Sequence, residues 1–345
     1  MPDSEPCQTN MDVRIASTAY ALPPAVETVE AIMEREKARV EAALHPLSTS
    51  LRKRILDGLG LKLVRVCGVK QPYDLALEAA VSALAEAEID AREVDLIIDF
   101  STLPGENGEY LSFAQKLSAD LGAETSLNFG FKVGGCGGLH LALKNALALM
   151  ATDESLRTAL LVTADSPPAG SRSLLPVTVQ GDAGSAVVLS RETNQGALVL
   201  AVEVLTLSHL HNTITVSRCG SGSGQLVINV DSTRLENELM PIYYLNFFRL
   251  VHKVLKKASL KLDDIDHFIY SNISRGDQEG FMKMLGLPGE KVYSAKLAEY
   301  GHTFASDLVI NYTDLRRDHR IRPGQLLLFA SAGIGFTWGV TLARA

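Results

Sequence analysis

Cys136 has the sequence surroundings of a catalytic nucleophile. Glycines stand on both sides of it, and residues 139–150 behind it predict a helix that is apolar on nearly every side. Such a helix is buried, and its positive N-terminal end favours the thiolate form of a nearby thiol. Glycines also let another molecule approach the backbone. We therefore expect Cys136 to accept an acyl group, although most free cysteines are small buried apolar residues.

An internal repeat links Cys136 to His302. Residues 84–98 correspond to residues 255–269, and each segment predicts an amphipathic helix, a short acidic loop and a buried strand. After both Cys136 and His302 the sequence predicts a helix, a polar loop and an apolar strand. The repeat is far longer than a solenoid unit, so it favours two similar halves that face each other. A pseudo-two-fold axis would then bring Cys136 and His302 together in the core.

The bulk properties of the chain exclude several classes of function. It has 345 residues, 46% of them hydrophobic, and a net charge of −7, which argues against nucleic acid as a partner. The four cysteines, Cys7, Cys67, Cys136 and Cys219, form no C-x-x-C pair, which argues against a zinc site or a disulfide framework. The first residues do not resemble a signal peptide, and no apolar run approaches the ~20 residues that span a bilayer. We expect a soluble cytoplasmic protein without a metal or a membrane partner.

Two glycine-rich turns bear on the proposed site. Residues 181–184 join a turn to a strand, without the G-x-G-x-x-G order of a dinucleotide site. Residues 332–339 form a turn between two predicted strands, in which backbone N–H groups can point at a substrate oxygen. This interpretation makes the backbones of Cys136 and Ile334 an oxyanion hole; the alternative is a tight hairpin with no other role.

Taken together, these segments resemble the thiolase-fold condensing enzymes, most closely the β-ketoacyl-acyl-carrier-protein synthase III family. The resemblance covers residues 70 to 345. It is carried by Cys136 at the start of a buried helix and by residues 181–189, 301–303, 321–324 and 335–339. It implies a five-layered α/β/α/β/α fold built from two pseudo-symmetric halves. We place these halves at residues 1–190, with the cysteine, and 191–345, with His302.

The resemblance also implies a catalytic set, which this chain alters. The family uses a cysteine, a histidine and an asparagine. Cys136 matches the cysteine, Ser271 stands where the histidine is expected, and His302 stands where the asparagine is expected. The related elongating synthases carry a second histidine at the asparagine position, so His302 follows their pattern there. Replacing a strong hydrogen-bond donor to the thioester oxygen costs on the order of 3 kcal/mol, which disfavours malonyl decarboxylation.

We therefore expect an acyltransferase with His302 as the base, acting in fatty-acid-like or polyketide and secondary-metabolite biosynthesis. The acyl group would pass from Cys136 to oxygen, to nitrogen or to a pre-formed carbanion. Two alternatives remain open. One is a catalytically degenerate subunit that supports an active partner chain, and the other is a decarboxylating ketosynthase that uses Cys136, Ser271 and His302.

The resemblance implies an acyl thioester of acyl-carrier protein or coenzyme A as substrate and no permanently bound cofactor. Asn272, Arg172 and Arg275 stand near family substrate contacts, and His209 follows a predicted strand near the expected substrate entrance. His209 is equally compatible with a solvated turn. Residues 26–57 predict one or two charged helices. Residues 51–60, which correspond to part of the family's coenzyme A clamp, lack its tryptophan. The family is usually homodimeric, so we expect a homodimer or a heterodimer with a related chain.

Overall fold

The computed structural model describes residues 12–45, 47–68, 70–103, 112–132, 134–218, 226–293 and 295–345. Cys7 and Cys219 lie outside these residues. The main sheet has the strand order β14-β13-β15-β16-β10-β1-β9-β6-β4-β5. Its N-terminal strands are β1 (Arg14–Ala21), β4 (Leu96–Asp99), β5 (Leu127–Gly130), β6 (Thr158–Asp165) and β9 (Ala183–Ser190). Its C-terminal strands are β10 (Ala197–Thr206), β13 (His267–Tyr270), β14 (Val292–Tyr293), β15 (Leu326–Gly333) and β16 (Thr337–Arg344).

The two sets of five strands repeat one pattern. In the first, β1 pairs antiparallel with β9 and β9 with β6, whereas β4 runs parallel to both β6 and β5. In the second, β10, β16, β15, β13 and β14 pair in the same order and directions. The sets join where β1 meets β10, with Arg14 opposite Leu198 and Ile15 opposite Ala197. This pairing is the structural form of the internal repeat.

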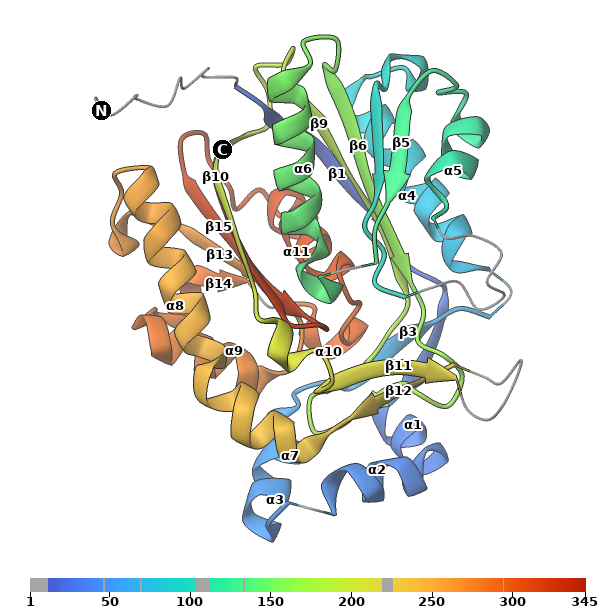
Figure 1. Cartoon of the computed structure of the whole chain (residues 1–345), viewed down its shortest axis with the longest axis vertical. Coiled ribbons are helices and arrows are strands. Elements are labelled where there is room, and N and C mark those ends of the chain that lie inside the picture. Colours follow the sequence, from blue (N-terminus) through green and yellow to red (C-terminus); the bar gives the residue numbers. More distant parts are fainter. Residues whose placement is uncertain are drawn as a thin grey trace.

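Two helices fill the space between the two sets of strands. Helix α6 (Gly138–Thr152) contacts β4 and β6 of the first set and β10 and β16 of the second. Helix α11 (Ser306–Arg317) contacts β1 and β9 as well as β13 and β15. Figure 1 shows both helices between the strands. The side chains of α11 are buried from Ser306 to Leu315, because sheet covers it on both sides.

Outer helices complete the layers. Helices α4 (Pro72–Ala87) and α5 (Ala114–Leu121) pack on the outer face of the N-terminal strands. Helices α8 (Met240–Lys257) and α9 (Arg275–Leu285) pack together on the outer face of the C-terminal strands (Figure 1). The predicted five-layered α/β/α/β/α fold is therefore confirmed.

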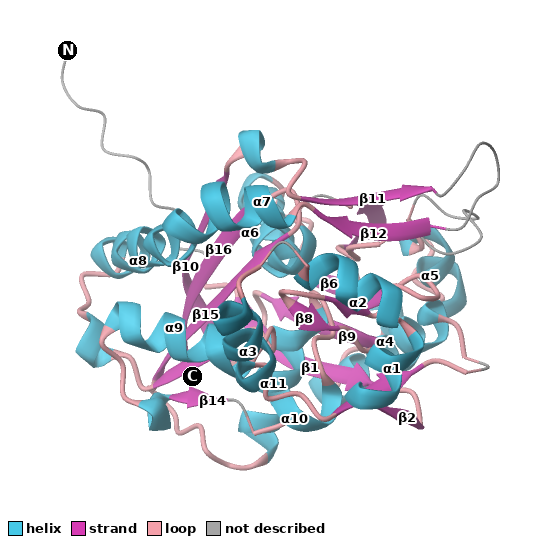
Figure 2. Cartoon of the chain, turned by 90° about the horizontal axis from the view of Figure 1, so that it is seen from below, coloured by secondary structure: helices cyan, strands magenta, loops and turns pink. Residues whose placement is uncertain are grey.

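The remaining elements gather at one end of the molecule, the lower part of Figure 1. Figure 2 views that end directly, with α1 to α3, α7 and the β11–β12 hairpin. The bounds of the helices are α1 (Val29–Arg35), α2 (Lys37–Leu44), α3 (Thr49–Gly58), α7 (Ser232–Arg234) and α10 (Leu297–Tyr300). The bounds of the strands are β2 (Ala25–Thr28), β3 (Leu63–Val66), β7 (Ser173–Leu174), β8 (Thr178–Val179), β11 (Ile214–Arg218) and β12 (Leu226–Val230).

Three short helices, not one or two, occupy the region that the sequence predicted as charged helix. The chain leaves helical geometry at Glu36, between α1 and α2. The Glu36 carboxylate accepts hydrogen bonds from the backbone N–H groups of Arg172 and Ser173. A new helix, α3, then begins behind Ser48, whose hydroxyl caps Leu51 N–H. In the described part of the chain, no helix has the length and apolar character needed to cross a membrane.

Candidate active site

Cys136 lies in a short 3₁₀ turn directly before α6 and is only 5% exposed. Gly135 precedes it at φ +50°, and a Cβ added there would lie 2.4 Å from the Ile334 nitrogen. A Cβ on Gly333 would lie 2.2 Å from the Cys136 nitrogen. The Ser331 hydroxyl donates to the Cys136 carbonyl at 2.9 Å. The turn between β15 and β16 therefore packs directly against the backbone of the nucleophile, and only glycine fits at this contact.

His302 is fixed by the N-terminal half of the chain. Its N–H donates to the Val179 carbonyl at 3.1 Å, and its carbonyl accepts from Gly181 N–H at 2.9 Å. The glycine turn at residues 181–184 thus anchors the histidine. The Nε2 atom lies 3.0 Å from Cys136 Sγ, so the two residues meet as the internal repeat predicts.

Asp307, in the first turn of α11, completes the arrangement. Its Oδ2 accepts from His302 Nδ1 at 2.6 Å and from Asn272 N–H at 2.7 Å. Its Oδ1 accepts from the Thr303 N–H and hydroxyl, both at 2.7 Å. An ionised carboxylate only accepts hydrogen bonds, so Nδ1 of His302 carries a proton and Nε2 faces the sulfur of Cys136. The result is a buried Cys-His-Asp triad.

The charges of this triad favour a protonated histidine. Burial alone lowers the pKa of His302, but the charges of Cys136 and Asp307 and its hydrogen bonds to both raise it more. The net effect holds the pKa of His302 well above its ordinary value. A protonated imidazole beside the sulfur stabilises the thiolate, which is the nucleophilic form of cysteine.

A cavity of about 1090 Å³ opens onto Cys136 and His302. Exposed side chains of α3 and of the α8 N-terminus, such as Arg54 and Met240, line one part of it. Most of the wall is apolar and includes Leu51, Ile55, Leu174, Ile214, Leu239 and Phe336. A ligand pocket of this size and character accommodates an extended or aromatic acyl group.

Ser271 and Asn272 do not line this cavity. Ser271 is buried, and its hydroxyl finds no hydrogen-bond partner within the described ranges. Asn272 is also buried, its side chain pairs with Asn311, and only its backbone N–H reaches Asp307. Ser271 stands where the resemblance places a catalytic histidine, and we assign neither it nor Asn272 a contact with substrate.

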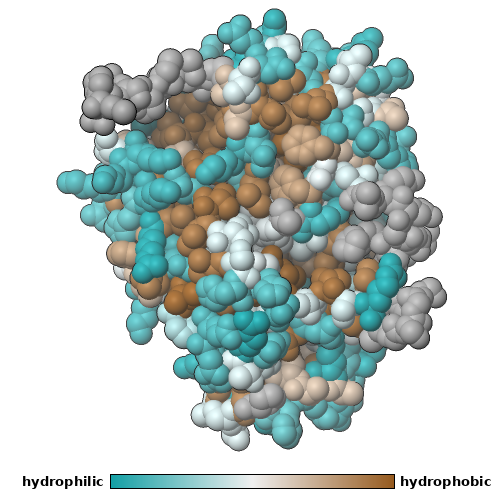
Figure 3. Space-filling model, in the orientation of Figure 1, coloured by the Kyte–Doolittle hydropathy of each residue, from teal (hydrophilic) through white to brown (hydrophobic). Residues whose placement is uncertain are grey.

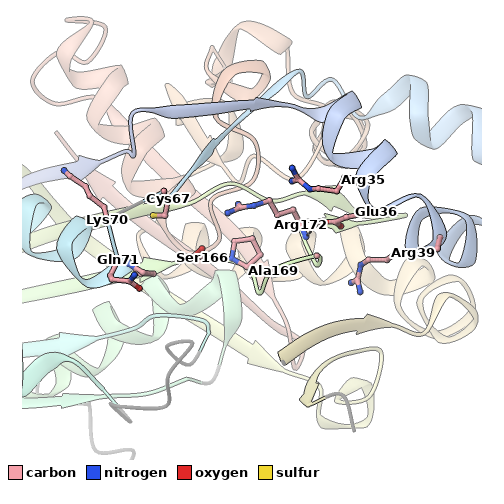
Figure 4. A pocket seen from close by; sticks show the side chains of 14 residues that line it. Arg35, Glu36, Arg39, Cys67, Lys70, Gln71, Ser166, Ala169 and Arg172 are labelled. Carbon is pink, nitrogen blue, oxygen red and sulfur yellow. Dashed lines mark hydrogen bonds between the residues drawn. The ribbon is translucent and has the colours of Figure 1, made fainter. Parts of the chain in front are cut away.

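Of the two arginines expected to bind substrate, the structure brings only Arg275 to the cavity, where it begins α9. The Arg172 guanidinium instead forms a two-pronged ion pair with the buried Asp182 carboxylate, at 2.7 and 2.9 Å. Arg172 lines a separate cavity of about 590 Å³, shown in Figure 4, together with Arg35 and Cys67. Asp182, in the glycine turn, therefore pairs with Arg172, which does not line the cavity of Cys136, and its expected substrate contact stays a prediction.

Two further histidines, His209 and His140, are not part of the triad. His209 is exposed in a short 3₁₀ turn after β10 and does not line the cavity, which fits the solvated-turn alternative. His140 is buried one turn along α6 and hydrogen-bonds to the Thr341 hydroxyl at 2.7 Å. Burial lowers the pKa of His140 to about 3, so it stays neutral and belongs to the core.

Comparison with known proteins identifies the family. The model of the 3-oxoacyl-[acyl-carrier-protein] synthase III C-terminal region matches residues 255–345. The β-ketoacyl-[acyl-carrier-protein] synthase III of Rhodospirillum rubrum is 31% identical over 281 residues, which cover 79% of this chain and 83% of that protein. The same enzyme of Porphyra umbilicalis is 26% identical over 350 residues, which cover 97% and 99% of the two chains.

Solved structures agree in fold. The 3-oxoacyl-[acyl-carrier-protein] synthase III of Aquifex aeolicus superimposes with a TM-score of 0.79 at 23% identity, covering 96% of this chain and all of that one. A protein named ChlB3 and described as an acyltransferase gives a TM-score of 0.80 at 24% identity, covering 97% and 98%.

Proposed function

Because the chain belongs to the β-ketoacyl-acyl-carrier-protein synthase III family, we propose that it is an acyltransferase that carries the acyl group on Cys136 and passes it on without decarboxylation. The observation that carries this proposal is the hydrogen-bonded chain from Cys136 Sγ through His302 to Asp307. The transferred group comes from an acyl thioester, and the acceptor is a hydroxyl, an amine or a pre-formed carbanion.

The first half-reaction acylates the enzyme. The Cys136 thiolate attacks the thioester carbon, and the carbonyl oxygen takes up the negative charge. The bond to the leaving thiolate then breaks, and His302 Nε2 gives that thiolate its proton. His302 is suited to this step because its raised pKa keeps the proton available near neutral pH.

The second half-reaction releases the acyl group. His302, now neutral, accepts at Nε2 the proton of an acceptor hydroxyl or amine, while Asp307 holds the proton on Nδ1. The acceptor attacks the Cys136 thioester, the carbon–sulfur bond breaks and the thiolate is restored. Asp307 stabilises the imidazolium that forms at this point, the same role as the aspartate of other nucleophile-histidine-aspartate triads.

The oxyanion in both half-reactions needs backbone donors. We assign this role to the N–H groups of Cys136 and Ile334, because Gly135 and Gly333 bring these two peptides into direct contact. Donors fixed in a buried site stabilise the developing charge without reorganising during the reaction.

Decarboxylation is disfavoured by the same geometry. Forming an enolate from a malonyl thioester calls for two strong donors to its oxygen. His302 is committed to proton transfer with Cys136, and Ser271 lies outside the cavity wall. Losing one such donor costs on the order of a hundredfold in rate. These points support transfer to oxygen or nitrogen over carbon–carbon bond formation with a malonyl unit.

Membership of the family supports a proposal for the donor and the pathway. We propose that acyl-carrier protein or coenzyme A delivers the thioester through the exposed end of the cavity beside α3. The pathway would be fatty-acid-like or polyketide and secondary-metabolite biosynthesis, and the working form a homodimer or a heterodimer with a related chain.

The test is intact-protein mass spectrometry after incubation with acyl coenzyme A thioesters of several lengths. We expect one acyl group per chain in the wild type and none in Cys136→Ala. Cys67→Ala is the matched control and should be labelled like the wild type. Burial, with a contribution from Asp182, raises the pKa of Cys67 to about 12, so its thiol is inert.

Two results would count against the proposal. Labelling that persists in Cys136→Ala would show that Cys136 is not the acylated nucleophile. A folded wild-type protein that no thioester acylates would favour the alternative of a degenerate subunit that supports an active partner chain.

A further inference from the structure

Among the ionisable groups that line the catalytic cavity outside the triad is a carboxyl group with a buried oxygen. Asp277, in the first turn of α9, lines the cavity. Its Oδ1 accepts a hydrogen bond from the Tyr244 hydroxyl at 3.2 Å. Its Oδ2 is buried, and no described residue donates to it. A buried carboxylate oxygen without a donor is costly, which makes Asp277 a strong candidate for a ligand contact.

No cation of the described chain compensates this carboxyl group directly. None of the ion pairs among the described residues includes Asp277. Arg275 is close in sequence, but its side chain packs along Gly60, where a Cβ would lie 3.0 Å from Nε of Arg275. The titratable groups around the Asp277 carboxyl are the hydroxyls of Tyr244 and Tyr270 and the more distant His302.

Two tyrosines of α8 line the cavity beside Asp277. Tyr243 and Tyr244 both line the cavity, with ring centroids 5.1 Å apart. Burial raises the pKa of Tyr243 far above its ordinary value, and the charges of both Asp277 and Cys136 raise it further. Tyr243 therefore lies within electrostatic range of both the nucleophile and Asp277. The Tyr270 hydroxyl is buried, does not line the cavity, and lowers the pKa of the Asp277 carboxyl from within the core.

A glycine of α9 holds Tyr244 close to Asp277. Gly280, one turn further along α9, has Tyr244 against it, and a Cβ there would lie 2.3 Å from the tyrosine oxygen. Gly276 packs against Gly58 of α3, with the added Cβ 3.7 Å from the Gly58 Cα. The contact at Gly276 is ordinary, whereas a side chain at Gly280 would displace Tyr244, so Gly280 keeps Tyr244 beside Asp277 at the cavity wall.

We propose that Asp277, with Tyr243 and Tyr244, forms a subsite for a hydrogen-bond donor, a hydroxyl or ammonium group, carried by the acyl group on Cys136. The acyl chain on Cys136 fills the apolar cavity, and its polar group reaches the unpartnered Oδ2 of Asp277. This inference rests on the proposed function and adds to it the class of acyl group. The substrate is then a hydroxyacyl or aminoacyl thioester rather than a plain fatty acyl thioester.

The experiment measures kcat/KM for acylation of Cys136 by intact-protein mass spectrometry. The probes are hexanoyl, octanoyl and benzoyl coenzyme A, each with and without a hydroxyl group on the carbon farthest from the thioester. The hexanoyl and octanoyl thioesters are also used with a terminal amino group. In the wild type we expect at least one hydroxyl or amino form to react about 10- to 100-fold faster than its parent, the range for a hydrogen bond to a charged group.

Variants assign that preference to Asp277. Asp277→Leu should bring the ratio near one and leave the parent thioesters as good or better substrates. Asp277→Asn should keep a preference for the hydroxyl form, since an amide oxygen accepts a hydrogen bond, but lose the preference for the ammonium form. Asp263→Asn, an exposed carboxyl group away from the cavity, is the matched control and should behave as the wild type.

Three results would overturn the subsite. The first is an equal kcat/KM for every substituted thioester and its parent in the wild type, and the second is a preference that survives in Asp277→Leu. The third is a kcat/KM that falls equally for all thioesters in Asp277→Asn, which would show a purely structural role. Each of these results includes acylation of Cys136 and so leaves the proposed function standing. Failure of every thioester to acylate the wild type would overturn both.

Discussion

Replacing Asp307 by asparagine removes the charge that organises the triad and keeps the size of the side chain. The Asp307 carboxylate accepts four hydrogen bonds, two on each oxygen. An amide can accept on one side only. If its oxygen faces His302, the NH₂ group meets Thr303 N–H. If its NH₂ group faces His302, it meets Asn272 N–H and donates to Nδ1.

Both orientations weaken the catalytic histidine. With the amide oxygen toward His302 the imidazolium loses the negative charge that helps to raise its pKa. With the NH₂ group toward His302 the ring proton moves to Nε2, which then cannot accept a proton from Cys136 or from an acceptor. The equivalent change in a nucleophile-histidine-aspartate triad costs about 10⁴-fold in kcat. We expect acylation by Asp307→Asn to be about 10³- to 10⁴-fold slower.

The fold should survive this change. One buried N–H left without an acceptor costs about 1–3 kcal/mol, within the 5–15 kcal/mol that stabilises a typical native protein. The matched control is Asp314→Asn on the same helix. Its carboxylate accepts from the Tyr20 hydroxyl at 2.6 Å and makes no contact with the triad.

Single-turnover acylation, quenched and read by intact mass, measures the effect, and thermal unfolding checks the fold. We expect Asp314→Asn to react like the wild type. A folded Asp307→Asn variant that is acylated within tenfold of the wild-type rate would refute the claim that Asp307 orients and charges His302.

Three further outcomes follow from the structure. Burial raises the pKa of Asp277 from 3.8 to about 6, so the folded state is relatively favoured at low pH and loses this advantage as the pH rises through 6. Asp277→Asn should therefore be more stable than the wild type by up to about 3 kcal/mol at pH 8 and equal to it near pH 4, as measured by urea unfolding; no difference at pH 8 would contradict the burial of an ionised carboxylate. His302→Asn should slow acylation by about two to four orders of magnitude, and a wild-type rate in that variant would show that His302 is not the working base. The protein should be a dimer by light scattering, with twice the mass of the 345-residue chain. The reasons are that β5 is a sheet edge with Leu127 exposed and that the face carrying α6 and β10 shows apolar surface (Figure 3). A stable monomer at micromolar concentration would contradict this.

The sequence predicted the parts of this structure that depend on pattern. The internal repeat predicted two matching halves, and these appear as two sets of five strands with one order and one set of directions. It also predicted that Cys136 and His302 would meet, since equivalent helix starts lie together across a pseudo-two-fold axis. The glycine turns were identified, and the reason for Gly135 and Gly333 is their backbone contact with Ile334 and Cys136.

The sequence could not predict which polar side chains complete the site. Asp307 follows His302 by five residues and lies in a helix whose side chains are buried from Ser306 to Leu315 although many of them are polar. A helix between two predicted strands with an aspartate in its first turn is the signal that could have found it. Arg172 was expected at the substrate because of its position in the family. Asp182 lies ten residues further on, and only the folded structure shows that the two side chains form an ion pair. Asp277 has no sequence signal beyond a polar residue near a helix start.

The central claim is that the Cys136 acyl-enzyme transfers its acyl group without decarboxylation and with the help of His302. The most direct measurement compares how fast the isolated acyl-enzyme is discharged by hydroxylamine and by malonyl coenzyme A, with released carbon dioxide counted in the second reaction. We predict discharge by hydroxylamine that is at least a hundredfold faster in the native enzyme than in the unfolded one or in His302→Asn, and little carbon dioxide. Rapid discharge by malonyl coenzyme A with one carbon dioxide per acyl group would contradict the claim and identify a decarboxylating ketosynthase.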